Sequence, residues 1–337
     1  VLKIMGEFAI SLYKEVGGID LGELPQMSWK DAMDNYGSDR PDIRFDLQLA
    51  DVTEIASKTE FKVFTEACNS GGSVKAMRVP GGAEKLTRKK TDGFAEIAKT
   101  YGAGGLPVVK YQGGEFATGV AKFVEPIKNE LVEALGLVDG DLVMFGVGSS
   151  RVACTSLGEV RLAVAKELDL IPEGMFRGLW VIDFPMFDWN EDAERWVSEH
   201  HPFTAPLASH LDTLESDPGN CLSSGYDLVI NGAEVGGGSI RIHNPEVQSK
   251  VFGLLGLSQE EAENKFGFLL NALRFGAPPH GGVAFGLDRL VMMMIGTTNI
   301  RDVIAFPKTQ TGADLMCEAP GAADPAQLEE LGIIMRA

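Results

Sequence analysis

The segment 226–243 combines acidic side chains, consecutive glycines, a hydroxyl and a guanidinium within a short stretch of chain. A guanidinium can form two parallel hydrogen bonds with a carboxylate, acids can hold a cation, and glycines let a flat ligand approach the backbone. The segment is therefore a candidate ligand pocket. A surface hairpin with a salt bridge fits the same spacing equally well. The residues concerned are Asp227, Glu234, Gly236, Gly237, Gly238, Ser239 and Arg241.

These side chains meet if the segment forms a strand, a glycine turn and a second strand. With the turn centred on the first two glycines of the run, Glu234 pairs across with Ser239, and Arg241 lies two residues further along on the same face. Asp227 then lies on the opposite face from Glu234. A metal site shared by these two acids would require a bulge or a bend in the strand.

Two other places hold side chains that could bind a ligand. Arg289 lies in the first turn of a predicted helix, where its charge opposes the helix dipole, and this arrangement makes sense where an anion binds. His200 and His201 are adjacent, which invites a metal interpretation. Neighbours on a strand point to opposite faces and no third ligand stands at helical spacing, so a role in orienting a substrate or in a polar network is favoured.

Composition restricts the classes of function. The chain has 337 residues, 45% hydrophobic and 23% charged, which is enough to bury the cores of two domains. A formal net charge of −18 argues against gripping nucleic acid with the whole surface, although a local contact is compatible with it. The sequence has no apolar run long enough to span a bilayer. The four cysteines have no paired spacing, so a reducing cytoplasm fits best.

The sequence changes character twice, which divides it into 1–57, 58–171 and 172–337. The first segment opens with an amphipathic helix over 1–16, so we expect the chain to begin within a domain. The middle segment alternates short apolar runs, glycine-rich turns and two helical stretches, which predicts a separate α+β unit. The apolar positions of the first helix are Leu2, Met5, Ala9, Leu12 and Val16.

The last segment supplies further scaffold. The segment 179–184, apolar except for Asp183, predicts a buried strand. Two helices are predicted at 246–255 and 258–275, and the second opens with Ser258 and Glu261 at the spacing of a capping box.

Seven motifs, in this order, resemble the class II aminoacyl-tRNA synthetases and specifically the bacterial-type aspartyl enzymes, over nearly the whole chain. The motif GLDRL alone marks only the class. The ensemble, with a middle segment similar to the insertion domain of the bacterial aspartyl enzymes, indicates the amino acid; asparaginyl and lysyl relatives resemble it less because they lack that unit. The motifs are YGSDRPD at 36–42, WVIDFPMF at 180–187, HHPFT at 200–204, NGAEVGGGSIRIH at 231–243, PPH at 278–280, GLDRL at 286–290 and IRDVIAFPK at 300–308.

The resemblance implies an amino-acid pocket. Arg241 would fork onto the side-chain carboxylate of aspartate, which suits its planar pair of donors. His200 and His201 would close the pocket on the substrate side, and Ser239 would also bind the substrate.

The resemblance also implies a nucleotide site. Arg289 would lie against the phosphates of ATP, and Arg289 and Glu234 would be the catalytic residues. Gly237 and Gly238 would line the ATP site with them. Asp227 and Glu234 would hold Mg²⁺ on the nucleotide.

The fold implied is α+β: a class II synthetase-type antiparallel sheet with flanking helices, in a catalytic domain formed by 1–57 and 172–337 and interrupted by an insertion domain at 58–171. The activity implied is aspartate–tRNA ligase, which activates aspartate with ATP to aspartyl-adenylate and transfers it to tRNA(Asp). We expect a cytoplasmic enzyme without membrane contact, and a homodimer for the full-length protein.

Three parts of the family pattern are not found: the anticodon-binding domain, the first motif, which builds the dimer interface, and the second motif, whose arginine holds ATP. We therefore expect an N-terminally incomplete chain that is inactive alone. The alternative is a non-catalytic synthetase paralogue or binding module. Intact Arg241, Glu234 and Arg289 favour the ligase.

Overall fold

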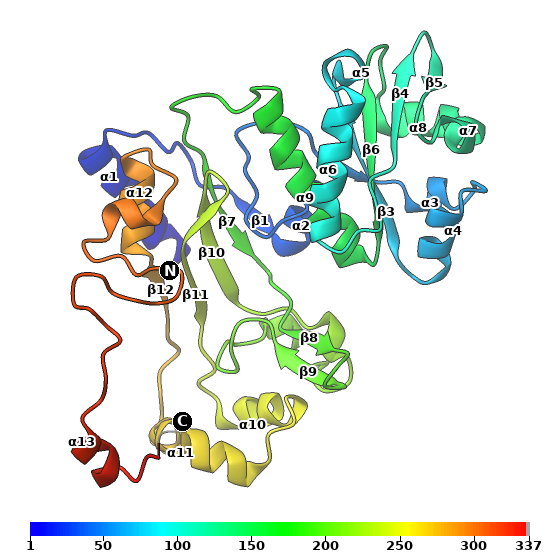
Figure 1. Ribbon diagram of the computed structural model, residues 1–337. Coiled ribbons are helices and arrows are strands. Elements are labelled where there is room, and N and C mark those ends of the chain that lie inside the picture. Colours follow the sequence, from blue (N-terminus) through cyan, green and yellow to red (C-terminus); the bar gives the residue numbers. More distant parts are fainter. Residues whose placement is uncertain (335–337) are drawn as a thin grey trace. The chain divides into compact units, whose positions relative to one another are not determined.

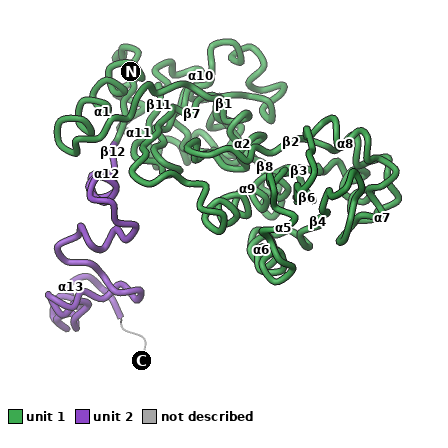
Figure 2. Tube along the Cα trace, turned by 90° about the horizontal axis from the view of Figure 1, so that it is seen from above, with its two compact units in different colours: residues 1–284 green, residues 285–337 purple. Residues whose placement is uncertain are grey.

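The computed structural model describes residues 1–334 and divides the chain into two compact units, residues 1–284 and 285–337 (Figure 2). The first unit contains two five-stranded sheets and a separate two-stranded hairpin (Figure 1). Helices flank both larger sheets, so the expected α+β fold is confirmed.

The first sheet carries the glycine-rich segment. Its strand order is β1-β7-β10-β11-β12; the pairs β7–β10 and β10–β11 are antiparallel, whereas β1 runs parallel to β7. The parallel pair follows from the long connection between β1 and β7, which contains the whole second sheet. The strands are β1 (Gln26–Ser28), β7 (Gly178–Ile182), β10 (Gly225–Ile230), β11 (Ala233–Ile240) and β12 (Gly281–Phe285).

The predicted strand at 179–184 forms as β7, which ends at Ile182, before Asp183 and Phe184. Leu179, Trp180 and Val181 are at most 2% exposed. Helix α2 (Trp29–Tyr36) contributes Ala32 to the same core. A strand buried on both faces is apolar throughout, and this explains the absence of alternation in its sequence.

Helix α1 (Leu2–Gly17) forms where the sequence predicts it and ends at Gly18, whose φ of 65° is the left-handed conformation of a helix C-cap. Its buried residues are Gly6, Ala9 and Tyr13, and Val16 is 71% exposed. The predicted apolar face is therefore wrong at Val16.

The second sheet has the order β2-β3-β6-β4-β5 and is antiparallel throughout. Helices α6 and α9 cover one of its two cores, and α4, α7 and α8 the other. Its first strand precedes residue 58, so the sheet begins before the predicted insertion boundary. The strands are β2 (Leu49–Asp51), β3 (Ser73–Val79), β4 (Val108–Gln112), β5 (Glu115–Ala117) and β6 (Leu142–Gly148); the helices are α3 (Thr53–Ala56), α4 (Lys62–Asn69), α5 (Gly82–Lys85), α6 (Arg88–Thr100), α7 (Ala121–Val124), α8 (Lys128–Leu135) and α9 (Ser150–Glu167).

A buried arginine joins α9 to the loop that leads into the second sheet. Arg161 is 1% exposed, and its guanidinium donates hydrogen bonds to the carbonyl oxygens of Leu47, Asp42 and Phe45 at 2.9–3.0 Å. The ring of Phe45 lies 4.0 Å from the guanidinium carbon. The loop is therefore fixed by one side chain from a distant part of the sequence.

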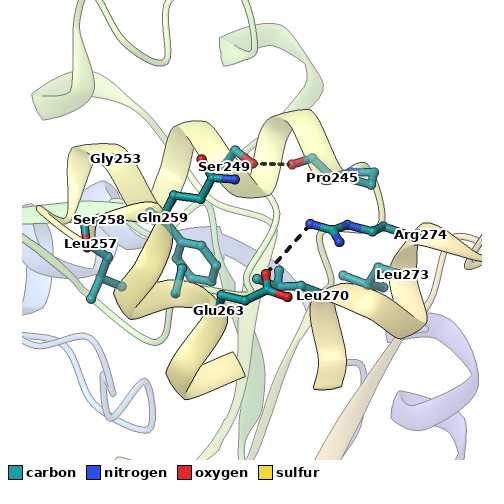
Figure 3. Close-up of a pocket in the computed structure, with 12 residues that line it drawn as sticks. Pro245, Ser249, Gly253, Leu257, Ser258, Gln259, Glu263, Leu270, Leu273 and Arg274 are labelled. Atoms are coloured by element: carbon teal, nitrogen blue, oxygen red, sulfur yellow. Dashed lines mark hydrogen bonds and ion pairs between the residues drawn. The ribbon is translucent and has the colours of Figure 1, made fainter. Parts of the chain in front are cut away.

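The predicted scaffold helices are α10 (Pro245–Leu254) and α11 (Gln259–Arg274), and the capping box between Ser258 and Glu261 is formed. Residues of both helices line a cavity of about 250 Å³ (Figure 3). The ion pair between Glu263 and Arg274, at 3.8 Å, lies at this cavity. The remaining elements of the first unit are the hairpin β8 (Phe187–Asn190) and β9 (Arg195–Ser198) and three single turns of 3-10 helix, Glu125–Ile127, Ala208–His210 and Pro218–Asn220.

The second unit is mostly irregular. Its elements are α12 (Leu287–Met294), the 3-10 turn Ile300–Val303 and α13 (Pro325–Glu330). Across residues 1–334, no helix has the length and apolar character needed to cross a membrane.

Candidate active site

The strands β10 and β11 form a hairpin, but its turn is not at the glycine run. Ile230 pairs with Ala233, so the turn residues are Asn231 and Gly232, with φ of 49° and 78°. An Asn-Gly pair with both φ values positive is the preferred two-residue hairpin turn. The predicted turn at Gly236 and Gly237 is therefore wrong, because these glycines lie within β11.

A bulge in the hairpin brings the two acids to one face. Val229 pairs with Glu234 and Leu228 with Gly236, so Val235 is an extra residue in β11. Since the bulge shifts the alternation of side chains by one residue, Glu234 and Asp227 share a face. The condition that the sequence set for a shared metal site is therefore met.

Both carboxylates converge on Gly237. A Cβ atom placed there would lie 2.3 Å from Oδ1 of Asp227 and 3.2 Å from Oε1 of Glu234. At Gly238 a Cβ atom would lie 1.8 Å from the carbonyl oxygen of Gly282 in β12. One glycine thus leaves room for the acids, and the next allows β12 to approach β11.

A cavity of about 260 Å³ lies over this face. The predicted pairing of Glu234 with Ser239 is wrong, because they pair with Val229 and Gly225. Even so, both residues line the cavity, together with Arg241. Its full lining is His200, His201, Thr204, Asp227, Glu234, Gly237, Gly238, Ser239, Arg241 and Ala284.

Of the predicted site residues, Arg289 is the one outside this lining. It is the third residue of α12 in the second unit, so the predicted position at a helix start is confirmed. Its side chain is exposed.

Hydrogen bonds to neighbouring side chains hold the guanidinium of Arg241 in place. Its Nη1 donates to Oγ of Ser239 at 2.8 Å and to Nδ1 of His201 at 3.2 Å, and Thr204 Oγ1 donates to Ser239 at 3.3 Å. Within residues 1–334, no ion pair joins Arg241 to a carboxylate. The alternative interpretation, a surface hairpin with a salt bridge to this arginine, is therefore wrong. The guanidinium keeps donors for a ligand carboxylate.

The contacts of His201 determine its protonation. Its Nδ1 accepts hydrogen bonds from the amide of Phe203, at 3.1 Å, and from Arg241, which can only donate. Nδ1 therefore carries no proton, and a neutral ring has its N–H at Nε2. Burial lowers the pKa of His201, and the charges of Arg241 and His200 lower it further.

His200 packs edge-on against the ring of Phe184, with ring centroids 4.6 Å apart. It keeps an exposed edge, but its surroundings remove enough water to lower its pKa, against the opposing effect of Glu234 and Asp39. Neither histidine belongs to a metal cluster: within residues 1–334, no group of three or more His, Cys, Asp and Glu side chains could hold a metal ion.

Asp227 is the most perturbed acid of the site. Burial raises its pKa to about 7, and the negative charges of Glu234 and Asp39 add to the effect. A cation between Asp227 and Glu234 would relieve this cost. Asp39 belongs to the motif at 36–42 and Thr204 to that at 200–204, yet neither was predicted as a site residue; the motifs were the signal that could have pointed to them.

One cavity beside a mainly antiparallel sheet thus brings together an arginine, an acid pair over a glycine strand and a histidine pair. Residues 1–310 match the family of class II tRNA synthetases (D, K and N), and the chain belongs to this family.

Curated relatives are similar over nearly the whole chain. The aspartate–tRNA(Asp/Asn) ligase of Nitratidesulfovibrio vulgaris is 50% identical over 325 residues, which cover 96% of this chain and 52% of that protein. The aspartate–tRNA ligase of Bacillus licheniformis is 48% identical over 333 residues, 98% of this chain and 56% of its own length. The chain thus spans about half the length of the curated relatives it matches. Among solved structures, the aspartyl tRNA synthetase from Entamoeba histolytica aligns with 45% of this chain and 25% of its own, with 25% identity and a TM-score of 0.30.

Proposed function

We propose that this chain is the aspartate-activating part of an aspartate–tRNA ligase. The observation that carries the proposal is Arg241, a guanidinium that Ser239 and His201 orient and that no carboxylate of residues 1–334 neutralises. A forked pair of hydrogen bonds from such a group selects a carboxylate over an amide. The names of the curated relatives favour aspartate as the amino acid.

The proposed first step joins aspartate to ATP. Arg241 holds the side-chain carboxylate, and the α-carboxylate then attacks the α-phosphate, so that aspartyl-adenylate forms and pyrophosphate leaves. The protein needs no covalent intermediate of its own, because orientation and charge neutralisation supply the rate enhancement. His200 and His201 close the substrate side, and Ser239 keeps Arg241 in position.

The acids of the hairpin fit Mg²⁺ on the nucleotide. Asp227 and Glu234 converge in a space that any side chain at Gly237 would fill. Magnesium is bound in proteins by one or two carboxylates together with substrate phosphates and water, which suits a pair of acids rather than a closed cage. The ion would neutralise charge on the phosphates. Gly238 and Glu234 would line the same ATP site, and Arg289 would contribute its charge to the phosphates.

The second proposed step transfers the aspartyl group to a terminal ribose hydroxyl of tRNA. One relative, at 50% identity, is named for tRNA(Asp/Asn), and another, at 48%, is named an aspartate–tRNA ligase. We therefore propose tRNA(Asp) as the substrate. A cytoplasmic location, a homodimer of the full-length enzyme and an insertion domain at 58–171 belong to the same proposal.

The second candidate is a synthetase paralogue that binds without catalysis. The assembled cavity favours the ligase over this candidate.

The test is ATP–pyrophosphate exchange, measured on this chain and on the natural gene product, with aspartate and with asparagine. The ligase predicts exchange by the natural product that depends on aspartate and is lost on Arg241→Leu. A natural product that binds aspartate without exchange would instead be the paralogue, and one that exchanges with asparagine alone would refute the aspartate assignment.

A further inference from the structure

A third cavity, larger than the two described above, lies in the first unit, and the proposed ligase activity does not use it. Its volume is about 690 Å³, within the range of small-molecule sites, about 300–1,000 Å³. Its walls come from the end of β1, α2, the start of α9, the segment from 183 to the start of β8, Glu199 directly after β9, and the segment 219–222. No residue lines both this cavity and the candidate active site.

The walls of this cavity offer an apolar surface to a ligand. Trp29 and Met33 come from α2, Pro185 precedes β8, and Phe187 is the first residue of β8. Leu222 forms an isolated β-bridge with Pro185. Phe187 is 3% exposed, so its position is fixed by the protein core. Indole and phenyl rings pack well against another aromatic ring.

The cations of this cavity are already paired. Arg151 Nη1 lies 2.7 Å from Oδ2 of Asp188, and Lys30 pairs with Asp34. The other oxygen of Asp34 lies 2.7 Å from the buried ammonium of Lys75. These groups therefore offer an anionic ligand no uncompensated positive charge.

Two carboxylates of the lining form no ion pair within residues 1–334, namely Asp183 and Glu199. Burial raises the pKa of Glu199; Arg151 opposes this, while Asp188 and Asp39 reinforce it. Asp183 has a φ of 56°, which is uncommon for a residue with a side chain and is retained at functional sites more often than elsewhere. The cavity thus has a net negative charge beside apolar walls.

We propose that this cavity binds a small molecule in which a protonated amine is attached to an aromatic body. The ammonium donates hydrogen bonds to Glu199 and Asp183, and the aromatic body lies against Trp29 and Phe187. The ammonium would offset the cost of burying two like-charged carboxylates. The aromatic body would remove the apolar wall from contact with water, which also favours binding.

The test uses three probes of matched size with the 337-residue chain: 2-phenylethylamine, 2-phenylethanol and 3-phenylpropionate. Binding is followed by saturation-transfer NMR and by calorimetric titration. We expect the amine to bind at least about tenfold more tightly than the alcohol, because a hydrogen bond to a charged group is the stronger kind, and the carboxylate not to bind.

The variants locate the amine. Glu199→Gln and Asp183→Asn should each weaken its binding about tenfold, and asparagine tolerates the left-handed backbone at 183. Glu191→Gln, an exposed acid outside the lining, and Asp227→Asn, in the other cavity, should leave binding unchanged. Circular dichroism confirms that each variant is folded.

Three results would overturn the proposal: no binding of the amine, equal binding of the amine and the alcohol, or binding that is lost in Asp227→Asn but kept in Glu199→Gln. The last result would place the amine in the acidic candidate active site instead.

Discussion

Arg241 donates a hydrogen bond from Nη1 to Nδ1 of His201 over 3.2 Å. This contact favours the neutral form of His201, because the imidazole accepts only when Nδ1 carries no proton. Among the residues that line the candidate active site, Arg241 is then the one permanent cation, opposite Asp227 and Glu234. A ligand with a carboxylate at one end and metal-bound phosphates at the other matches this separation of charge.

Arg241→Leu should reduce aspartate-dependent pyrophosphate exchange by at least about 100-fold, since two charge-assisted hydrogen bonds of about 1.5–3 kcal/mol each are lost. Exchange by the natural gene product is the measurement. Arg88→Leu is the matched control, because Arg88 is 94% exposed and far from the site in the sequence. Equal activity of the two variants would remove Arg241 from the amino-acid pocket.

Adjacent glycines should respond differently to alanine. In Gly237→Ala the new Cβ would displace the carboxylate of Asp227, so we expect Mg·ATP affinity to fall by about tenfold or more. The fold should persist, because a side-chain end can move. In Gly238→Ala the Cβ meets the backbone of β12, so the free energy of unfolding should fall by about 1–3 kcal/mol. Titration with Mg·ATP measures the effect on affinity, and urea denaturation measures the effect on stability. An equal loss of stability in the two variants would contradict the different roles assigned to the two glycines.

Much of the fold follows from local patterns in the sequence. The apolar run of β7 and the capping box of α11 are set by neighbouring residues, so periodicity and caps predict them. The glycine run misled the prediction because glycine marks a turn only where the backbone needs positive φ. Here Asn231 and Gly232 already supply the turn.

The shared face of Asp227 and Glu234 depends on a single extra residue, Val235. A strand pattern alone gives no sign of such a bulge, since it arises from the pairing of two strands. The hydrogen bonds from Arg161 to the loop at 42–47 likewise cannot be predicted from the sequence. Their acceptors are backbone carbonyl oxygens more than a hundred residues away. Chemistry of the site was therefore easier to predict than its geometry.

Arg161→Met should destabilise the first unit by about 3–5 kcal/mol, because buried carbonyl oxygens lose their donors. Burial lowers the pKa of Arg161 to about 10, so the guanidinium still donates as a cation at neutral pH. Arg161→Lys should recover only part of the loss, since an ammonium lacks the planar fork. Urea denaturation measures both, with Arg88→Met as the exposed control. A loss below that of the control would mean that the loop is held by other contacts.

The last prediction concerns acid stability and the buried Lys75, which is 2% exposed and lies 2.7 Å from Asp34 and 3.2 Å from Asp51. Burial alone would raise the pKa of both acids, but hydrogen bonds from Lys30 and Lys75 to Asp34, and from Thr53 and Lys75 to Asp51, lower it. Burial would also lower the pKa of Lys75, but its two acids raise it.

The unfolded chain binds more protons than the folded one wherever a folded acid has a lowered pKa, so stability falls as pH falls. The contribution of Asp34 and Asp51 is therefore complete above the unfolded pKa of about 3.9 and is lost below it. The contribution of Lys75 is lost only at alkaline pH. In Lys75→Met the free energy of unfolding should fall less steeply between about pH 5 and about pH 2 than in the wild type. Thermal melts across this range measure it, and parallel pH profiles of the two proteins would show that Lys75 does not set the charge of these acids.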